Sequence, residues 1–183
     1  LDLIPLPALR KPQLNGSQTA IVVGQSNRRV ESDPLGRIRV RFHWQEPDEH
    51  SGWIRVKNAI ASDQYGSIAI PHVNTEVIID FINGDADQPV VIGSLYNANN
   101  PPPASLTEPL AGFYTAATNI SFDDSAKAEN FFIHTAGSLT ESVAHNKSAH
   151  IGTHSQLTVT AQDYTIHSEQ SISINAHSFL KFK

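Results

Sequence analysis

The C-terminal third of the chain carries apolar residues that recur every eight residues, many of them in pairs. Within a pair the spacing is two residues, the period of a strand with one buried face. Ser, Thr, Gln, Asn and His fill most of the intervals, and the step from Val159 to Ile166 is seven residues. The ten members of this repeat, here called the octad residues, are Val143, Ile151, Leu157, Val159, Tyr164, Ile166, Ile172, Ile174, Leu180 and Phe182.

One such repeat does not stabilise itself. Ordering eight residues costs about 8–16 kcal/mol of backbone entropy, whereas burying two apolar side chains returns roughly 3–6 kcal/mol. A ladder built by one chain also leaves long strand edges unpaired, and intertwined chains would pair them. We therefore expect residues 131–183 to be one strand of an intertwined β-needle. An ordinary β-sandwich with regularly spaced strands is the alternative.

Composition favours an all-β protein and excludes several classes. Eleven prolines and ten glycines accompany a hydrophobic content of 39%, and few stretches have a helical pattern. Without cysteine there is no disulfide framework and no thiol chemistry. No apolar run reaches membrane-spanning length. Methionine is absent even at position 1, which predicts a fragment or a processed product.

Charge divides the chain into a basic and an acidic stretch. Residues 58–126 carry acids and no Lys or Arg, and the net charge of −5 argues against a general nucleic-acid binder. Such an asymmetry predicts faces that meet each other, within a subunit or between subunits; separate solvation of the two is the alternative. The bases of residues 28–57 are Arg28, Arg29, Arg37, Arg39, Arg41, Arg55 and Lys57.

Between an extended linker, residues 1–16, and the proline run 101–103, short strands recur at regular intervals. Asn83-Gly-Asp85 predicts a hairpin turn between the last two of them. Five or six strands in about eighty residues suit a small closed barrel of the OB type, which we place at residues 17–103. The predicted strands are Thr19–Val23, Arg37–Trp44, Trp53–Val56, Ser67–Ile70, Glu76–Ile82 and Pro89–Leu95.

The second of these strands alternates strictly between apolar and polar residues. This predicts Ile38, Val40, Phe42 and Trp44 on the core face, and Arg37, Arg39 and Arg41 with His43 on the other. Three consecutive prolines cannot form a central strand and mark a domain boundary. After it, residues 104–130 are expected to hold a connector and the first needle strands. There, runs 120–124 and 130–134 flank a polar turn and predict a hairpin.

Four barrel segments carry a family resemblance: Asp33-Pro-Leu-Gly-Arg-Ile-Arg-Val-Arg-Phe-His-Trp44, Ser51-Gly-Trp-Ile-Arg-Val56, Ile70-Pro-His-Val-Asn-Thr-Glu-Val-Ile-Ile-Asp-Phe81 and Gly84-Asp-Ala-Asp-Gln-Pro-Val-Val-Ile-Gly-Ser-Leu-Tyr-Asn97. They resemble VgrG, the spike protein of the bacterial type VI secretion system, which is similar to the central spike of contractile phage tails. The resemblance is dense over residues 18–103 and looser in the needle, where the octad glycine occurs only at Gly152.

The resemblance implies a homotrimer with an OB collar followed by a triple-stranded β-helix, a trimeric β-prism needle whose core is the octad residues. It implies a cell-puncturing device that carries effectors, with Hcp-like tube hexamers and a PAAR-like tip protein as partners. Assembly in the bacterial cytoplasm, propulsion to the target envelope and transient membrane contact by piercing are implied too.

Sequence motifs favour this structural role over chemistry. We expect no enzyme activity and no cofactor, because Gly84-Asp-Ala-Asp87 is typical of a capped turn and only secondarily of paired catalytic acids. Six needle histidines could form metal-binding rings in a trimer, yet their octad positions mostly differ, so we expect no metal site. The Arg37, Arg39 and Arg41 row is expected to face a neighbouring subunit's acids. An OB-type binding module for nucleic acid or glycan is the alternative function.

Overall fold

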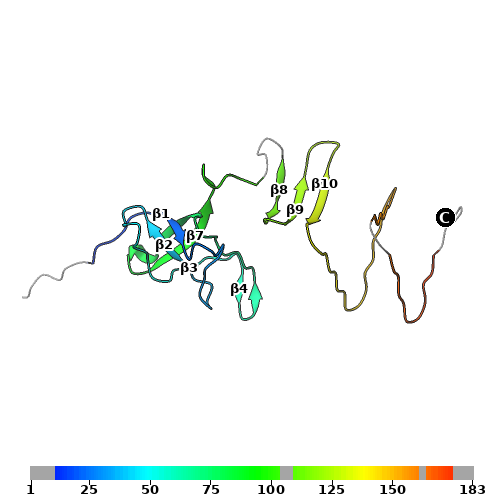
Figure 1. The fold of residues 1–183 in the computed structure, drawn as a ribbon, viewed down its shortest axis with the longest axis horizontal. Helices are drawn as coiled ribbons and strands as arrows, with labels where there is room; N and C mark the ends of the chain where they lie inside the picture. The colour runs from blue at the N-terminus through cyan, green and yellow to red at the C-terminus, as the bar shows by residue number, and fades with distance from the viewer. Residues whose placement is uncertain (1–10, 104–108, 161–163, 175–183) are drawn as a thin grey trace, which may run out of the picture. The chain divides into compact units, whose positions relative to one another are not determined.

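The computed structural model describes residues 11–103, 109–160 and 164–174 and divides into two units after Gly137 (Figure 1). The first unit contains a five-stranded sheet, a two-stranded hairpin and a three-stranded sheet. No α-helix occurs in the described ranges, so the predicted all-β class is confirmed. The same ranges hold no helix long and apolar enough to cross a membrane.

The five-stranded sheet closes into the predicted barrel. Its strand order is β2-β1-β6-β7-β3, and β3 and β7 run parallel while the other neighbours are antiparallel. The first and last strands in this order meet through Ile38 and Ile54, which exchange backbone hydrogen bonds of 2.9 and 2.7 Å. This closed order with one parallel pair is the OB topology. The strands are β1 (Gln18–Val23), β2 (Arg39–Phe42), β3 (Arg55–Val56), β6 (Glu76–Phe81) and β7 (Pro89–Leu95).

Each barrel strand, or the bridge residue that directly precedes it, points aliphatic side chains into the barrel. Alternation in β1 and β6 places Ala20, Val22, Val77 and Ile79 fully inside, because successive side chains point to opposite faces. The turn between β6 and β7 is the 3-10 helix η1 (Ile82–Gly84), at the predicted position of the hairpin turn. The remaining buried core residues are Ile38, Val40, Ile54, Phe81 and Val91.

Two details of the predicted barrel are wrong. Ser67–Ile70 is not a strand; instead β4 (Ala61–Ser62) and β5 (Tyr65–Gly66) form a short hairpin. A Cβ at Gly66 would lie 2.4 Å from a backbone oxygen, so glycine alone permits this close pairing, a signal the strand pattern does not carry. Trp44 also leaves the core face: β2 ends at Phe42, and Trp44 is 64% exposed while its ring stacks on Phe42.

A three-stranded antiparallel sheet follows the proline run. The predicted hairpin forms as β9 (Thr118–Asp123) and β10 (Asn130–Thr135). A third strand, β8 (Leu110–Tyr114), pairs with β9 and was not predicted, since Leu-Ala-Gly-Phe-Tyr lacks a clear alternation. Gly112 permits this pairing, because a Cβ there would lie 2.5 Å from the Ile120 backbone oxygen.

In the second unit, the described residues after Gly137 contain no strand within the single chain. The octad residues Val143 through Ile174 are all exposed there. Leu180 and Phe182 lie outside the described residues. The β-needle therefore stays a prediction, consistent with the estimate that one repeat cannot bury its own apolar face.

Candidate assembly interface

One face of the β8–β10 sheet is entirely apolar at its central positions. The registers place Phe113 opposite Ile120, and Ile120 opposite Ile133. Since side chains alternate between faces, residues that pair directly share a face. We call this set the apolar sheet face: Ala111, Phe113, Ile120, Phe122, Phe131 and Ile133.

The apolar sheet face is open to solvent in the single chain. Phe113 is 80% exposed, and Phe131 is 58% exposed although its ring stacks on that of Phe122 at 5.1 Å. The opposite face is more polar, with Asn119, Ser121 and Asp123 from β9. A contiguous exposed apolar surface of this kind is typical of an interaction site.

In the sequence, the octad residues continue the spacing of this face. Thr135 ends β10, pairs with Thr118 and alternates with Ile133, so it lies on the apolar sheet face. Val143 follows Thr135 by eight residues, and Ile151 follows Val143 by eight. The sequence pattern predicts no core role for the face itself, because the face is complete only with β8. The exposed octad residues are Val143, Ile151, Leu157, Val159, Tyr164, Ile166, Ile172 and Ile174.

Two of the three arginines in the predicted charge row have acid partners in their own chain. Arg37 contacts Asp33 through Nη2 at 2.6 Å and Nε at 2.7 Å. Arg39 pairs with Glu31, and its guanidinium lies 4.8 Å from the centre of the Trp53 ring. The residue patterns did not predict these acid partners. A contact of the row with a neighbouring subunit stays a prediction.

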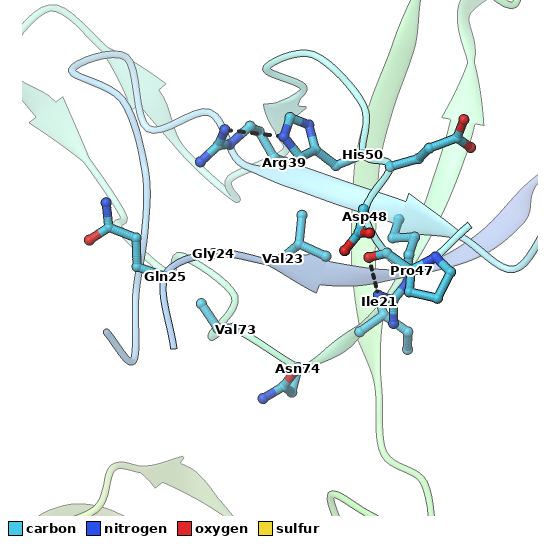
Figure 2. A pocket seen from close by; sticks show the side chains of 12 residues that line it. Ile21, Val23, Gly24, Gln25, Arg39, Pro47, Asp48, His50, Val73 and Asn74 are labelled. Atoms are coloured by element: carbon cyan, nitrogen blue, oxygen red, sulfur yellow. Dashed lines mark hydrogen bonds between the residues drawn. The ribbon is translucent and has the colours of Figure 1, made fainter. Parts of the chain in front are cut away.

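Arg41, the third arginine of the row, lines a hollow of about 420 Å³ on the barrel. Arg39, Pro47 and His50 line the same hollow (Figure 2). The Arg41 Nη1 donates a 2.9 Å hydrogen bond to the carbonyl oxygen of Pro47. Asp48 and Glu49 line the same hollow, and the Arg39 guanidinium lies 3.5 Å from His50 Nε2. With acids beside the arginines, this surface is not the uniformly cationic groove that single-stranded nucleic acid requires.

The Glu31 carboxylate is nearly buried. It accepts hydrogen bonds that connect the β1–β2 loop to β2. A hydrogen bond from the Gln25 N–H at 2.6 Å, followed by the Arg39 contact, holds the Glu31 pKa below its usual value of 4.5. A lowered carboxyl pKa stabilises the fold above the unfolded pKa, and this stability is lost as pH falls through the folded pKa.

Glu31→Gln is therefore expected to lower the Tm at pH 7, with the difference from wild type shrinking as pH falls below about 4.5. Scanning calorimetry across pH 7 to pH 3 measures this. Asp48→Asn is the matched control, because Asp48 is exposed. A Tm difference for Glu31→Gln that stays constant with pH would contradict the charge role.

Within the described ranges, no group of three or more His, Asp or Glu residues could hold a metal ion. His177, one of the six needle histidines, lies outside these ranges. Asp85 and Asp87, considered above as paired acids, both contact Lys11, and the Asp85 carboxylate also caps the turn.

Comparison with known families agrees with the barrel. Residues 18–96 match the model of the type VI secretion system/phage-baseplate injector OB domain. Those residues belong to this injector family. The match covers β1 through β7, so the injector OB domain is the closed barrel and excludes the β8–β10 sheet.

Curated relatives extend the similarity beyond the injector OB domain. The spike protein VgrG4b of Pseudomonas aeruginosa is 35% identical over 171 residues, 85% of this chain and 21% of that protein. VgrG3 of Vibrio cholerae is 38% identical over 138 residues, 68% of this chain and 13% of that protein. The actin cross-linking toxin VgrG1 of Vibrio cholerae is 36% identical over 140 residues, which are 68% of this chain and 12% of that protein.

The chain therefore resembles VgrG spike proteins over most of its length and spans about a fifth, or less, of the length of these relatives. The similarity supports a structural role in a type VI secretion spike. The cross-linking activity named for one relative belongs to a protein of which 12% is aligned, so it is not transferred to this chain.

Proposed function

We propose that three copies of this chain intertwine through the octad residues and the apolar sheet face to form the needle of a type VI secretion spike. The observation that carries this proposal is the run of apolar residues that a single chain leaves exposed, at a period of eight, from Val143 to Ile174. An interface of this kind is buried only when further copies supply the facing side chains.

The proposed work of the spike is mechanical. Strands wound around a dry axis pair their backbone groups between chains, which makes a thin rod that resists bending and unwinding. Such a rod transmits axial force through a target envelope without a catalytic residue. We accordingly assign no enzyme activity to this segment.

The partners and location of the spike follow from its resemblance to VgrG. A tube of Hcp-like hexamers would support the collar, a PAAR-like protein would close the tip, and effectors would travel with the assembly. The spike would be assembled in the bacterial cytoplasm, secreted, and brought into brief contact with the target membrane. The injector OB domain would act as the collar that joins the needle to the rest of the protein.

Light scattering of the full 183-residue chain tests the proposal. We expect a single species of three chain masses at micromolar concentration. A clean monomer would overturn the proposal. The alternative, an OB module that binds nucleic acid or glycan, predicts instead a compact species whose mass or mobility shifts on adding an oligonucleotide or oligosaccharide; the acids beside Arg39 and Arg41 argue against it.

A further inference from the structure

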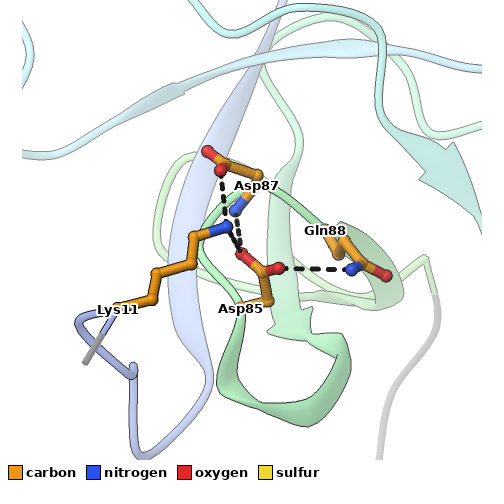
Figure 3. Close-up of polar contacts among 4 residues, drawn as sticks. All are labelled: Lys11, Asp85, Asp87 and Gln88. Carbon is orange, nitrogen blue, oxygen red and sulfur yellow. Dashed lines mark hydrogen bonds and ion pairs between the residues drawn. The ribbon is translucent and has the colours of Figure 1, made fainter. Parts of the chain in front are cut away.

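The β6–β7 turn receives a lysine from the segment that precedes the barrel. The Lys11 ammonium lies 2.5 Å from Asp85 Oδ1 and 2.6 Å from Asp87 Oδ2, between two carboxylates more than seventy residues away in sequence (Figure 3). The sequence pattern predicts a capped turn at the two acids and does not pair them with Lys11.

Backbone contacts join the same two segments. Gln13 forms an antiparallel bridge with Asp85, and the Leu14 N–H donates a 2.9 Å hydrogen bond to the Gly84 carbonyl oxygen. Gly84 has φ of +72°, and a Cβ there would lie 3.2 Å from the Leu14 carbonyl oxygen. Glycine therefore serves both the left-handed turn and the close approach of the incoming segment.

The receiving carboxylate is held in place by its own turn. Asp85 accepts hydrogen bonds from the Asp87 N–H at 2.9 Å and from Gln88 Nε2 at 3.2 Å. Its side chain is 23% exposed, whereas that of Asp87 is 80% exposed. Because the turn already orders Asp85, binding Lys11 costs little further entropy on the acid side. Asp87 contributes charge without a comparable structural role.

We propose that residues 11–14 are a strap that docks on the β6–β7 turn and fixes this segment to the barrel. The ammonium and the Leu14 amide attach the strap at two points, and Pro12 between them has a restricted φ, which stiffens the connection. Without these contacts the segment would be a flexible tether. The docking contacts lie within one chain, so the strap does not depend on the proposed needle.

Hydrogen exchange by mass spectrometry on the full chain tests the strap, read on peptides that cover residues 12–16. Lys11→Glu places a third carboxylate against Asp85 and Asp87, and we expect the Leu14 amide to exchange about threefold to tenfold faster. The double variant Lys11→Glu/Asp87→Lys restores an opposite charge and leaves Asp85 to cap the turn. Its exchange is expected to return to within about twofold of wild type.

Asp63→Lys is the matched control, because Asp63 is an exposed acid between β4 and β5 and takes no part in the strap. We expect it to leave Leu14 exchange unchanged, and we expect protection of the β6 core amides to be the same in every variant. Unchanged Leu14 exchange in Lys11→Glu, no recovery in the double variant, or an equal effect of Asp63→Lys would each overturn the strap.

Discussion

Ile166→Asp is expected to disassemble the needle or to lower its free energy of unfolding by roughly 3 kcal/mol or more per trimer. In a three-chain core each octad residue occurs three times per layer. Three carboxylates would then meet in an apolar interior, where desolvation and like-charge repulsion disfavour their ionised forms. Thermal unfolding followed by circular dichroism, together with light scattering, measures the loss.

Gln170→Asp is the control for this substitution. Gln170 lies between the octad pairs, is exposed, and receives the same new charge as Ile166→Asp. We expect its effect to stay within about 0.5 kcal/mol, as for a surface substitution. Equal effects of the two variants would mean that the octad register, or the shared core itself, is wrong.

Removing residues 138–183 is expected to convert the protein to a monomer or to a much weaker trimer at micromolar concentration. The cut after Gly137 keeps β10 paired with β9, so the barrel and the β8–β10 sheet stay complete. The removed stretch contains every octad residue and hence most of the proposed shared burial. Light scattering and the unfolding rate in denaturant measure the result.

The unfolding rate tests whether the removed residues hold the three chains together, which a change in mass alone does not show. Three intertwined strands must unwind together, so the full chain should unfold slowly, and the shortened chain should unfold at least about tenfold faster. A shortened chain that keeps the trimeric mass and the slow rate would place the main interface on the injector barrel or the apolar sheet face instead.

Short apolar or alternating runs between turn signals let the sequence predict the strands that build the barrel. Residues such as Val22, Val40 and Ile79 are buried where a period of two places them, because one face of each strand must leave water. The pattern failed where its signal is short or local. The Ser67–Ile70 run has two isoleucines at the right spacing, yet the close approach at Gly66 forms β4 and β5 instead.

The sequence predicted the strands that carry part of the apolar sheet face, but not the face itself. Phe122, Phe131 and Ile133 lay in the predicted hairpin, but their common face became evident from the pairing register. Register depends on contacts between strands, and a shift by one residue would have moved every side chain to the other face. Phe113 joins them through β8, whose own five residues carry no strand pattern.

Sequence by itself determined the all-β class, the barrel strands and the eight-residue period, because each is a local pattern of burial that repeats along the chain. Tertiary structure alone decided which charges meet. Arg39 in β2 pairs with Glu31 in the β1–β2 loop. Lys11, which precedes β1, pairs with Asp85 and Asp87 in the β6–β7 turn. Ion pairs form between side chains that the fold brings within a few ångströms, and chain closure over such separations leaves no periodic trace in the sequence.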